Sequence, residues 1–250
     1  MRLLVCLASL LFADVDVTNS DQLRAAAARA TPGTTIRLAP GRYEGGVYLQ
    51  NLRGRPGAPI VIKGADREKP SVLDGGPYGL MLSKASHVEI RDLVVWRSTE
   101  NGINIDDGGD FANPSTGVVL SGVVVREVGP GGNRDGLKLS GVAEFRVEDC
   151  LFDRWGDSGS GIDMVGCRDG EIVGCVFRLG GGEGGNGVQT KGGTRDVTVR
   201  DCRFDRAGQR AINIGGSTGR QFFRPRIEGY EAKDIRVEGC TILGSAAAVA

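Results

Sequence analysis

The sequence predicts an all-β fold: a single-stranded right-handed parallel β-helix, which is a solenoid, with a helix covering its N-terminal end. Three observations lead to this prediction. Glycine accounts for 41 of the 250 residues, more than twice its usual share of roughly 7%, which indicates many turns. A segment pattern recurs along the chain every 25 to 38 residues. Each repeat has room for short strands but for no helix between them, which excludes strand–helix–strand crossovers.

One apolar position marks the repeat most clearly. It is occupied in turn by Leu93, Val123, Cys150, Cys175, Cys202 and Cys240. Stacked coils place equivalent residues above one another at about 4.8 Å, so these side chains should form one interior ladder. Disulfides or a metal site are the alternative, but the chain has one histidine and no Cys-x-x-Cys pair. Because small thiols pack well in a dry core, we expect reduced, buried cysteines.

A second set of strands alternates apolar and polar residues. These strands are Gly102–Ile105, Gly136–Leu139, Gly161–Met164, Gly187–Thr190 and Ala211–Ile214. With a period of two, the residue between the apolar ones points outward, which gives the column Asn104, Lys138, Asp163, Gln189 and Asn213. The next outward position carries Asp106, Ser140, Val165, Lys191 and Gly215. The preceding turn carries Asn101, Asp135, Ser160, Asn186 and Arg210.

These columns predict a shallow ligand-binding groove. The small residues that begin the strands are expected to keep this strip of surface low; they are Gly102, Gly136, Gly161, Gly187 and Ala211. The alternative is a ladder of amides and one Lys138–Asp163 ion pair that only satisfies stacking, worth about 0–1 kcal/mol when exposed. The candidate substrate-binding residues are Lys138, Asp163, Asn186, Gln189, Asn213, Asn104 and Asp135.

The N-terminal end of the solenoid should be covered by a helix in residues 19–33. Asn19 or Ser20 can cap it, Gln22 can complete a capping box, and Pro32-Gly33 ends it. Such a helix would protect the open edge of the first coil, which begins near Thr35.

Residues 1–13 are expected to be a secretory signal peptide. One arginine precedes an apolar stretch that ends at a possible cut after Ala13; a buried first strand is the alternative. The protein would then be secreted or periplasmic. Residues 14–250 are expected to form one β-helix domain that lacks a C-terminal cap, because the chain stops just after a strand pattern. No apolar run reaches the length of about 20 residues that a membrane span needs.

The charge distribution favours an anionic polymer as the ligand. The whole chain balances 31 basic residues against 31 acidic ones, but residues 186–226 hold nine basic residues and three acidic ones. A basic segment beside a polar groove attracts a polyanion. A nucleic acid is disfavoured, because the groove strands carry no column of aromatic residues on which bases could stack.

Two segments near the N-terminus resemble a known superfamily. Residues 31–45 and 57–64, which read TPGTTIRLAPGRYEG and GAPIVIKG, resemble the opening of pectate-lyase-like β-helix proteins, most of all the chondroitinase-B and alginate-lyase family of polysaccharide lyases. In that family, a lysine and an arginine on successive coils carry the reaction. Residues 186–193 resemble the coil that bears this lysine, which implies catalytic roles for Lys191 and, on the next coil, Arg210.

Cleavage of a uronate polymer by β-elimination needs a base for the C5 proton, a group that neutralises the carboxylate, and a proton for the leaving oxygen. Lysine and arginine can serve as the first two, and Ca²⁺ can take the neutralising role. Asp106, Asp107 and Asp110 could bind Ca²⁺, but a turn of solvated carboxylates is the more common meaning of such a pattern.

The sequence leaves three functions open. The favoured one is a secreted protein that acts on an acidic, uronate-containing polysaccharide by β-elimination. The second is a non-catalytic β-helix that binds glycans or has a structural role. The third is a glycoside hydrolase, because residues 133–138 resemble a stretch of β-helix polygalacturonases, and Asp135 and Asp163 could serve as acid and base.

Overall fold

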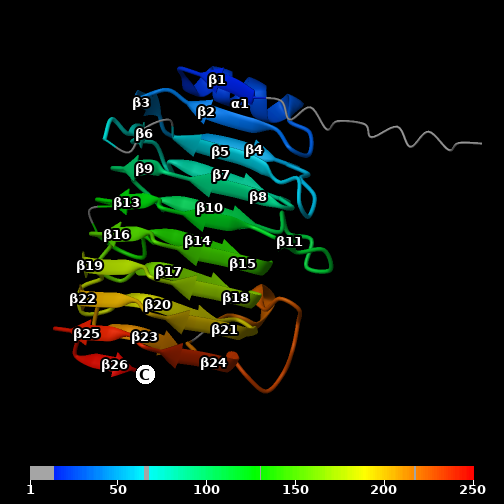
Figure 1. The fold of residues 1–250 in the computed structure, drawn as a ribbon. Helices are drawn as coiled ribbons and strands as arrows, with labels where there is room; N and C mark the ends of the chain where they lie inside the picture. The colour runs from blue at the N-terminus through cyan, green and yellow to red at the C-terminus, as the bar shows by residue number, and fades with distance from the viewer. Residues whose placement is uncertain (1–13, 65–67, 130, 217) are drawn as a thin grey trace, which may run out of the picture.

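Three parallel sheets wind into one solenoid (Figure 1). The computed structural model describes residues 14–64, 68–129, 131–216 and 218–250. Eight coils follow one another from β2 to β26, and each contributes one strand to each sheet. The predicted all-β parallel β-helix is therefore confirmed. The predicted signal peptide, residues 1–13, lies outside the described residues.

The chain passes through the sheets in the order A, B, C within every coil. Sheet A holds β1 (Asp14–Val17), β2 (Thr35–Leu38), β5 (Ile60–Gly64), β8 (Val88–Arg91), β12 (Val119–Ser121), β15 (Val142–Glu148), β18 (Arg168–Val173), β21 (Thr194–Arg200) and β24 (Ala232–Glu238), with β11 (Ser115–Thr116) beside β15. Sheet B holds β3 (Gly41–Glu44), β6 (Ser71–Asp74), β9 (Leu93–Trp96), β13 (Val124–Arg126), β16 (Leu151–Asp153), β19 (Val176–Gly180), β22 (Arg203–Ala207) and β25 (Thr241–Leu243). Sheet C holds β4 (Val47–Gln50), β7 (Leu80–Ser83), β10 (Ile103–Asp106), β14 (Leu137–Ser140), β17 (Ser160–Val165), β20 (Asn186–Lys191), β23 (Arg210–Ile214) and β26 (Ala247–Val249).

The N-terminal helix covers the first coil, as predicted. Helix α1 (Ser20–Arg29) begins after Asn19, whose side chain accepts a hydrogen bond from the amide of Gln22. It buries Leu23 against the core and contacts β1, β2 and β4. Strand β1 was not anticipated; it pairs with β2 and adds one strand to sheet A beside the helix. Among the described residues, the helices are α1 and the short 3-10 turn η1 (Arg220–Phe222), and neither is long and apolar enough to cross a membrane.

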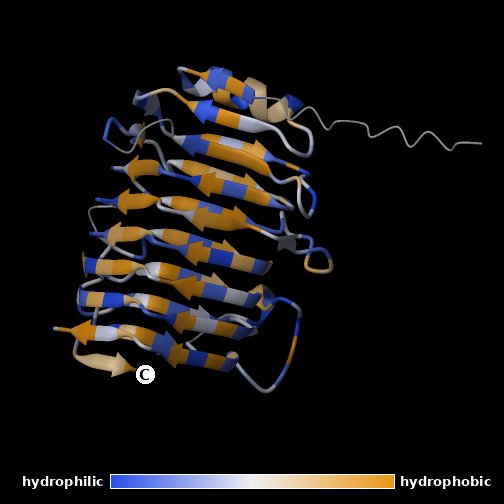
Figure 2. Ribbon diagram, viewed as in Figure 1, coloured by the Kyte–Doolittle hydropathy of each residue, from blue (hydrophilic) through white to orange (hydrophobic). Residues whose placement is uncertain are grey.

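The interior ladder forms where the sequence predicts it. The residue after each ladder position donates a backbone hydrogen bond to the carbonyl of the ladder residue in the preceding coil. These hydrogen bonds connect the coils of Val123, Cys150, Cys175, Cys202 and Cys240 in order. The described cysteines are free thiols; all are buried except Cys240, which is partly exposed. Apolar residues alternate with polar ones along the strands (Figure 2), so that one face of each sheet supplies the core.

The glycines that begin the sheet C strands have a different role from the predicted one. A Cβ atom placed on Gly161 would lie 2.7 Å from the ring of Phe177, and one on Gly187 would lie 2.7 Å from the ring of Phe204. Phe152, Phe177 and Phe204 form a fully buried stack with ring centroids 5.1 and 4.7 Å apart. The glycines thus make room for this stack inside the core. The expectation that they keep the groove surface low was wrong, because their missing side chains point inward.

Candidate functional site

The predicted outward columns of sheet C are confirmed by the strand register. Asn104 pairs with Lys138, Lys138 with Asp163, Asp163 with Gln189 and Gln189 with Asn213. In the neighbouring column, Val165 pairs with Lys191, and in the preceding turn, Asn186 pairs with Arg210. Parallel in-register stacking therefore brings residues from five coils onto one face.

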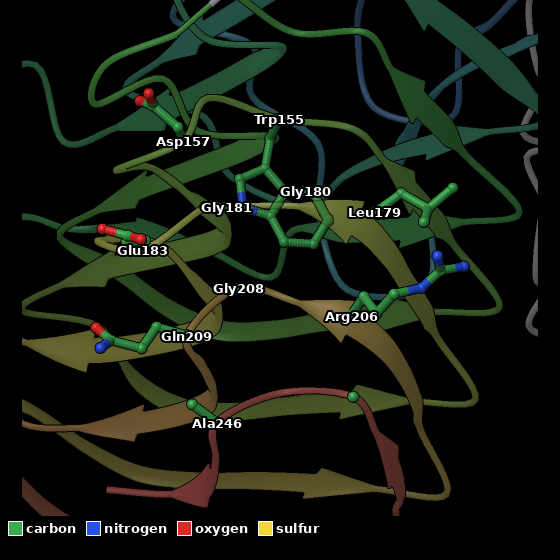
Figure 3. A pocket seen from close by; sticks show the side chains of 12 residues that line it. Trp155, Asp157, Leu179, Gly180, Gly181, Glu183, Arg206, Gly208, Gln209 and Ala246 are labelled. Atoms are coloured by element: carbon green, nitrogen blue, oxygen red, sulfur yellow. The ribbon is translucent and has the colours of Figure 1, made fainter.

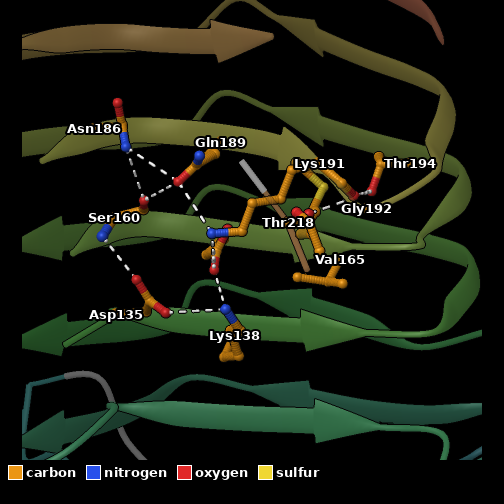
Figure 4. Close-up of polar contacts among 12 residues, drawn as sticks. Asp135, Lys138, Ser160, Val165, Asn186, Gln189, Lys191, Gly192, Thr194 and Thr218 are labelled. Atoms are coloured by element: carbon orange, nitrogen blue, oxygen red, sulfur yellow. Dashed lines mark hydrogen bonds and ion pairs between the residues drawn. The ribbon is translucent and has the colours of Figure 1, made fainter. Parts of the chain in front are cut away.

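Two lysines converge on one buried carboxylate. The Nζ atom of Lys191 lies 3.1 Å from Oδ2 of Asp163, and the Nζ atom of Lys138 contacts the same oxygen (Figure 4). The Asp163 side chain is 1% exposed, whereas those of Lys138 and Lys191 are 23% and 17% exposed. The long lysine side chains thus cover Asp163 and present their ammonium groups to the groove. Asp163 therefore lies beneath the two lysines, and the lysines lie between it and the groove.

A second carboxylate lies beneath the groove beside the first. Oδ1 of Asp135 accepts a hydrogen bond of 2.8 Å from the amide of Ser160, and its Oδ2 lies 3.5 Å from Nζ of Lys138. Burial, followed by the nearby carboxylate of Asp163, raises the pKa of Asp135 to about 6. Burial lowers the pKa of Lys138, but Asp163 and Asp135 outweigh it, and the net shift is upward. Asp135 is 2% exposed and, like Asp163, lies beneath the groove surface.

Amide and hydroxyl groups extend the polar network toward the next coil. The side-chain amide of Asn186 donates to Oε1 of Gln189 at 3.2 Å, and the hydroxyl of Ser160 donates to the same oxygen at 3.3 Å. Nζ of Lys191 donates to it at 3.4 Å. This network fixes Gln189 and Lys191 relative to each other. Asn186 is buried, so it orients Gln189 from below.

The two residues with predicted catalytic roles line one hollow. An open pocket of about 470 Å³ is lined by Lys191, Arg210, Gln189 and Asn213, with Asn186 at its floor. Asn104 lies outside this pocket, where its side chain accepts a hydrogen bond from Asn101 at 3.0 Å. We call the surface formed by the pocket and the two lysines the Lys191 groove.

Residues 216 and 218–231 also border the Lys191 groove, and the sequence did not predict their position there. Gly216 lies against Gln189 and Lys191, since a Cβ atom there would come within 3.4 Å of both side chains. Glu231 holds the segment in place: its carboxylate accepts hydrogen bonds of 2.8 Å from the amides of Thr218 and Gly192. The signal in the sequence was the long interval between the ladder residues Cys202 and Cys240, which leaves room for an insertion.

The predicted Ca²⁺ ligands do not form a metal site. Oδ2 of Asp107 is 2.7 Å from Nε of Arg224, which reaches it from the inserted segment. Asp106 accepts hydrogen bonds from Ser83 and Gly108, and Asp110 accepts one from Asn113. Within the described part of the chain, no group of three acidic, histidine or cysteine residues could hold a metal ion. Each of the three carboxylates is used by a different local contact.

Comparisons with known proteins place this architecture. The family described as "Right handed beta helix region" matches residues 78–249. An alginate lyase from Paenibacillus sp. str. FPU-7 has a similar structure, with a TM-score of 0.73 at 19% identity over 91% of this chain and 75% of that chain. A mannuronic acid specific polysaccharide family 6 lyase from human gut microbiota matches with a TM-score of 0.65 at 16% identity, over 81% of this chain and 52% of that chain. The pectate lyase Pel9A matches with a TM-score of 0.55 at 15% identity, over 93% of this chain and 77% of that chain. A search of curated proteins finds no match. At these identities the likeness establishes the fold.

Proposed function

The chain belongs to the right-handed β-helix family, and we propose that its Lys191 groove binds an acidic, uronate-containing polysaccharide and cleaves it by β-elimination. The similar structures named above include lyases that act on alginate and pectate, which supports an acidic polysaccharide as the substrate class. The groove itself supports the same class, because the three cations Lys138, Lys191 and Arg210 outnumber the two carboxylates, Asp163 and Asp135, that lie beneath them.

One observation carries the proposal: Lys191 shares its buried carboxylate with a second lysine. Because Lys138 also contacts Asp163, the negative charge of Asp163 stays compensated when Lys191 releases its proton. In a single Lys–Asp pair, loss of the lysine proton would leave the buried carboxylate without a positive partner, so such a pair would resist this step. Lys191 can therefore act as a base while Lys138 keeps the site electrically balanced.

The reaction follows from these positions. Arg210 pairs with the uronate carboxylate, which makes the neighbouring C5 proton more acidic. The neutral amine of Lys191 takes that proton; the electron pair forms the C4–C5 double bond, and the bond between C4 and the leaving oxygen breaks. The leaving oxygen receives a proton, which the Lys191 ammonium formed in the first step can supply. The products are a chain with a new hydroxyl end and one with an unsaturated uronate.

The hydrolase alternative fits the site less well. It needs two carboxyl groups that flank a glycosidic bond in the groove. Asp135 and Asp163 are both buried beneath lysine side chains, so neither reaches a bound sugar. If the protein only binds glycans, the same groove residues contact the polymer, and the Lys191 ammonium binds one of its anionic groups.

The product spectrum separates these functions. The full-length protein is incubated with alginate, polygalacturonate and chondroitin sulfate, and both ultraviolet absorbance and reducing ends are followed. A lyase produces the absorbance of the unsaturated uronate together with reducing ends. Reducing ends without that absorbance would show hydrolysis, and affinity for a polymer that stays intact would show a binding protein.

We also propose that the protein acts outside the cytoplasm, where such polymers occur. A cut after Ala13 would leave the chain to start at Asp14, the first residue of strand β1. The N-terminal sequence of the protein recovered from the producing cell should therefore begin at Asp14, and a mature chain that still begins at Met1 would contradict this.

A further inference from the structure

A second groove follows the corner where sheet B turns into sheet C. Two hollows of about 880 and about 530 Å³ share Trp155 and Leu179, so they form one continuous surface. Figure 3 shows the residues that line the first of them. It extends along the solenoid axis from Arg97 to Ala246. We call it the corner groove. Turns that include Asp157–Ser158 and Glu183–Gly184 separate it from the Lys191 groove, because the first residue of each pair lines one groove and the second lines the other.

The edge of the corner groove repeats with the coils. One turn position is occupied by Arg97, Glu127, Arg154, Leu179 and Arg206, all with φ between 50° and 60°. Backbone hydrogen bonds from Arg97, Glu127 and Arg154 to the following coil keep these turns in register. The arginines therefore recur at every second coil, about 10 Å apart, which is twice the strand spacing. Such a regular edge suits an extended polymer lying along the axis.

Trp155, Leu179 and a run of glycines form the floor of the corner groove. The indole of Trp155 packs on the backbone of Gly180, where a Cβ atom would come within 2.3 Å of the ring. Leu179 is 40% exposed beside it. A run of glycines from Gly180 to Gly182 continues the surface without side chains. The apolar face of a pyranose ring can lie against such a floor.

Polar atoms in the wall lack partners. Nε1 of Trp155 and Oγ of Ser98 are buried, and neither has a hydrogen-bond partner among the described residues. Trp155 is 6% exposed and Ser98 is 1% exposed. Gly181 lies against the indole nitrogen without a side chain, so a ligand would reach the N–H only if this turn shifted. Buried donors without partners are costly, and an acceptor oxygen from a bound sugar would satisfy them.

The charges of the corner groove select against the substrate of the Lys191 groove. Arg97, Arg154 and Arg206 are balanced by Glu127, Asp157 and Glu183. Arg97 is already paired with Asp74, and Arg154 with Glu127. Asp157 and Glu183 lie at the boundary between the two grooves and repel a polyanion that would cross it. Mixed charged groups still form hydrogen bonds with sugar hydroxyls.

We propose that the corner groove binds a neutral, hydroxyl-rich glycan chain, separately from the acidic polymer in the Lys191 groove. The site would hold the protein on a matrix that contains both kinds of polymer. The proposal does not depend on catalysis in the Lys191 groove.

Tryptophan fluorescence tests it directly. The chain has two tryptophans, and Trp96→Phe leaves Trp155 as the single reporter. The variant is titrated with cellohexaose, mannohexaose, xylohexaose and hexamannuronate. At least one neutral hexasaccharide should give a saturable change in the emission of Trp155, and hexamannuronate should give none. Leu179→Ala and Arg206→Ala in the same background should weaken binding about five-fold or more, and Lys191→Ala should leave it unchanged.

Trp96 donates a hydrogen bond to Glu127, so Trp96→Phe could disturb the groove. Calorimetry of the unmodified protein with the same sugars controls for this effect. No binding of any of the three neutral hexasaccharides by either method would overturn the proposal. Binding of hexamannuronate that changes Trp155 emission and is lost in Lys191→Ala would also overturn it, because the corner groove would then be an extension of the Lys191 groove.

Discussion

The Nζ atom of Lys191 lies 3.1 Å from Oδ2 of Asp163, a carboxylate whose side chain is 1% exposed. Lys138 contacts the same oxygen from the coil on the other side. Asp163 therefore sets the positions of two ammonium groups at once, although it does not reach the substrate itself. In the proposed reaction its contribution is indirect, through the orientation and charge of the lysines.

Asp163→Asn should lower kcat of polymer cleavage about ten-fold or more, with a smaller change in KM. The carboxamide keeps the shape but cannot compensate two ammonium groups, so Lys191 loses its fixed position. Asp153→Asn is a matched control: Asp153 is also buried and pairs with Arg178 at 3.0 Å, but on sheet B. Both variants should lose stability, and only Asp163→Asn should lose activity. Equal kcat values in the two variants would contradict a positioning role for Asp163.

The raised pKa of Asp135 predicts a pH dependence of stability. The folded protein keeps a proton on Asp135 up to a pKa of about 6, whereas the ordinary value is 3.8. The stabilisation from this group is therefore fully present below about pH 4 and is lost as the pH rises through about 6; it is on the order of 3 kcal/mol. In urea unfolding, the free energy of unfolding of the wild type relative to Asp135→Asn should fall between about pH 4 and pH 7. A constant difference would show that Asp135 titrates normally.

The glycines under the groove strands should matter for packing. Gly187→Ala should lower the free energy of unfolding by about 1–3 kcal/mol, because the new methyl group would overlap Phe204 and the carbonyl of Ala211. Gly131→Ala is the control, since the nearest atom to a Cβ there is 3.6 Å away. A Gly187→Ala protein with wild-type stability and weakened polymer binding would restore the groove-shape interpretation.

The thiols should differ in reactivity along the ladder. Burial raises the pKa of the Cys167 thiol to about 12. The neighbouring Cys175, followed by burial, also raises the pKa of the Cys202 thiol. Cys150, Cys167, Cys175 and Cys202 should therefore resist labelling in the native protein, whereas Cys240 is partly exposed and should react first. Mass spectrometry after timed labelling with iodoacetamide identifies the order. Rapid labelling of Cys175 would contradict a closed core.

Periodicity alone was enough to predict the coils and the facing columns. The two-residue alternation placed Lys138, Gln189 and Lys191 on one face, and the ladder of Cys150, Cys175 and Cys202 fixed the register. Periodicity could not predict how deeply each side chain is buried. Asp163 has an outward position by alternation, yet the longer lysines of the adjacent coils cover it. The contact of Arg224 with Asp107 joins positions 117 residues apart through an insertion that breaks the repeat.

The rate of formation of unsaturated uronate by Lys191 variants tests the central claim most directly. On a polymer that the wild type cleaves, Lys191→Ala should lose activity by about 100-fold or more while remaining folded. Lys191→Arg should fail as well, because a guanidinium group does not give up its proton near neutral pH. Lys233→Ala, which removes an exposed lysine of strand β24, should keep the wild-type rate. A Lys191→Ala protein that still forms unsaturated uronate at the wild-type rate would contradict the account.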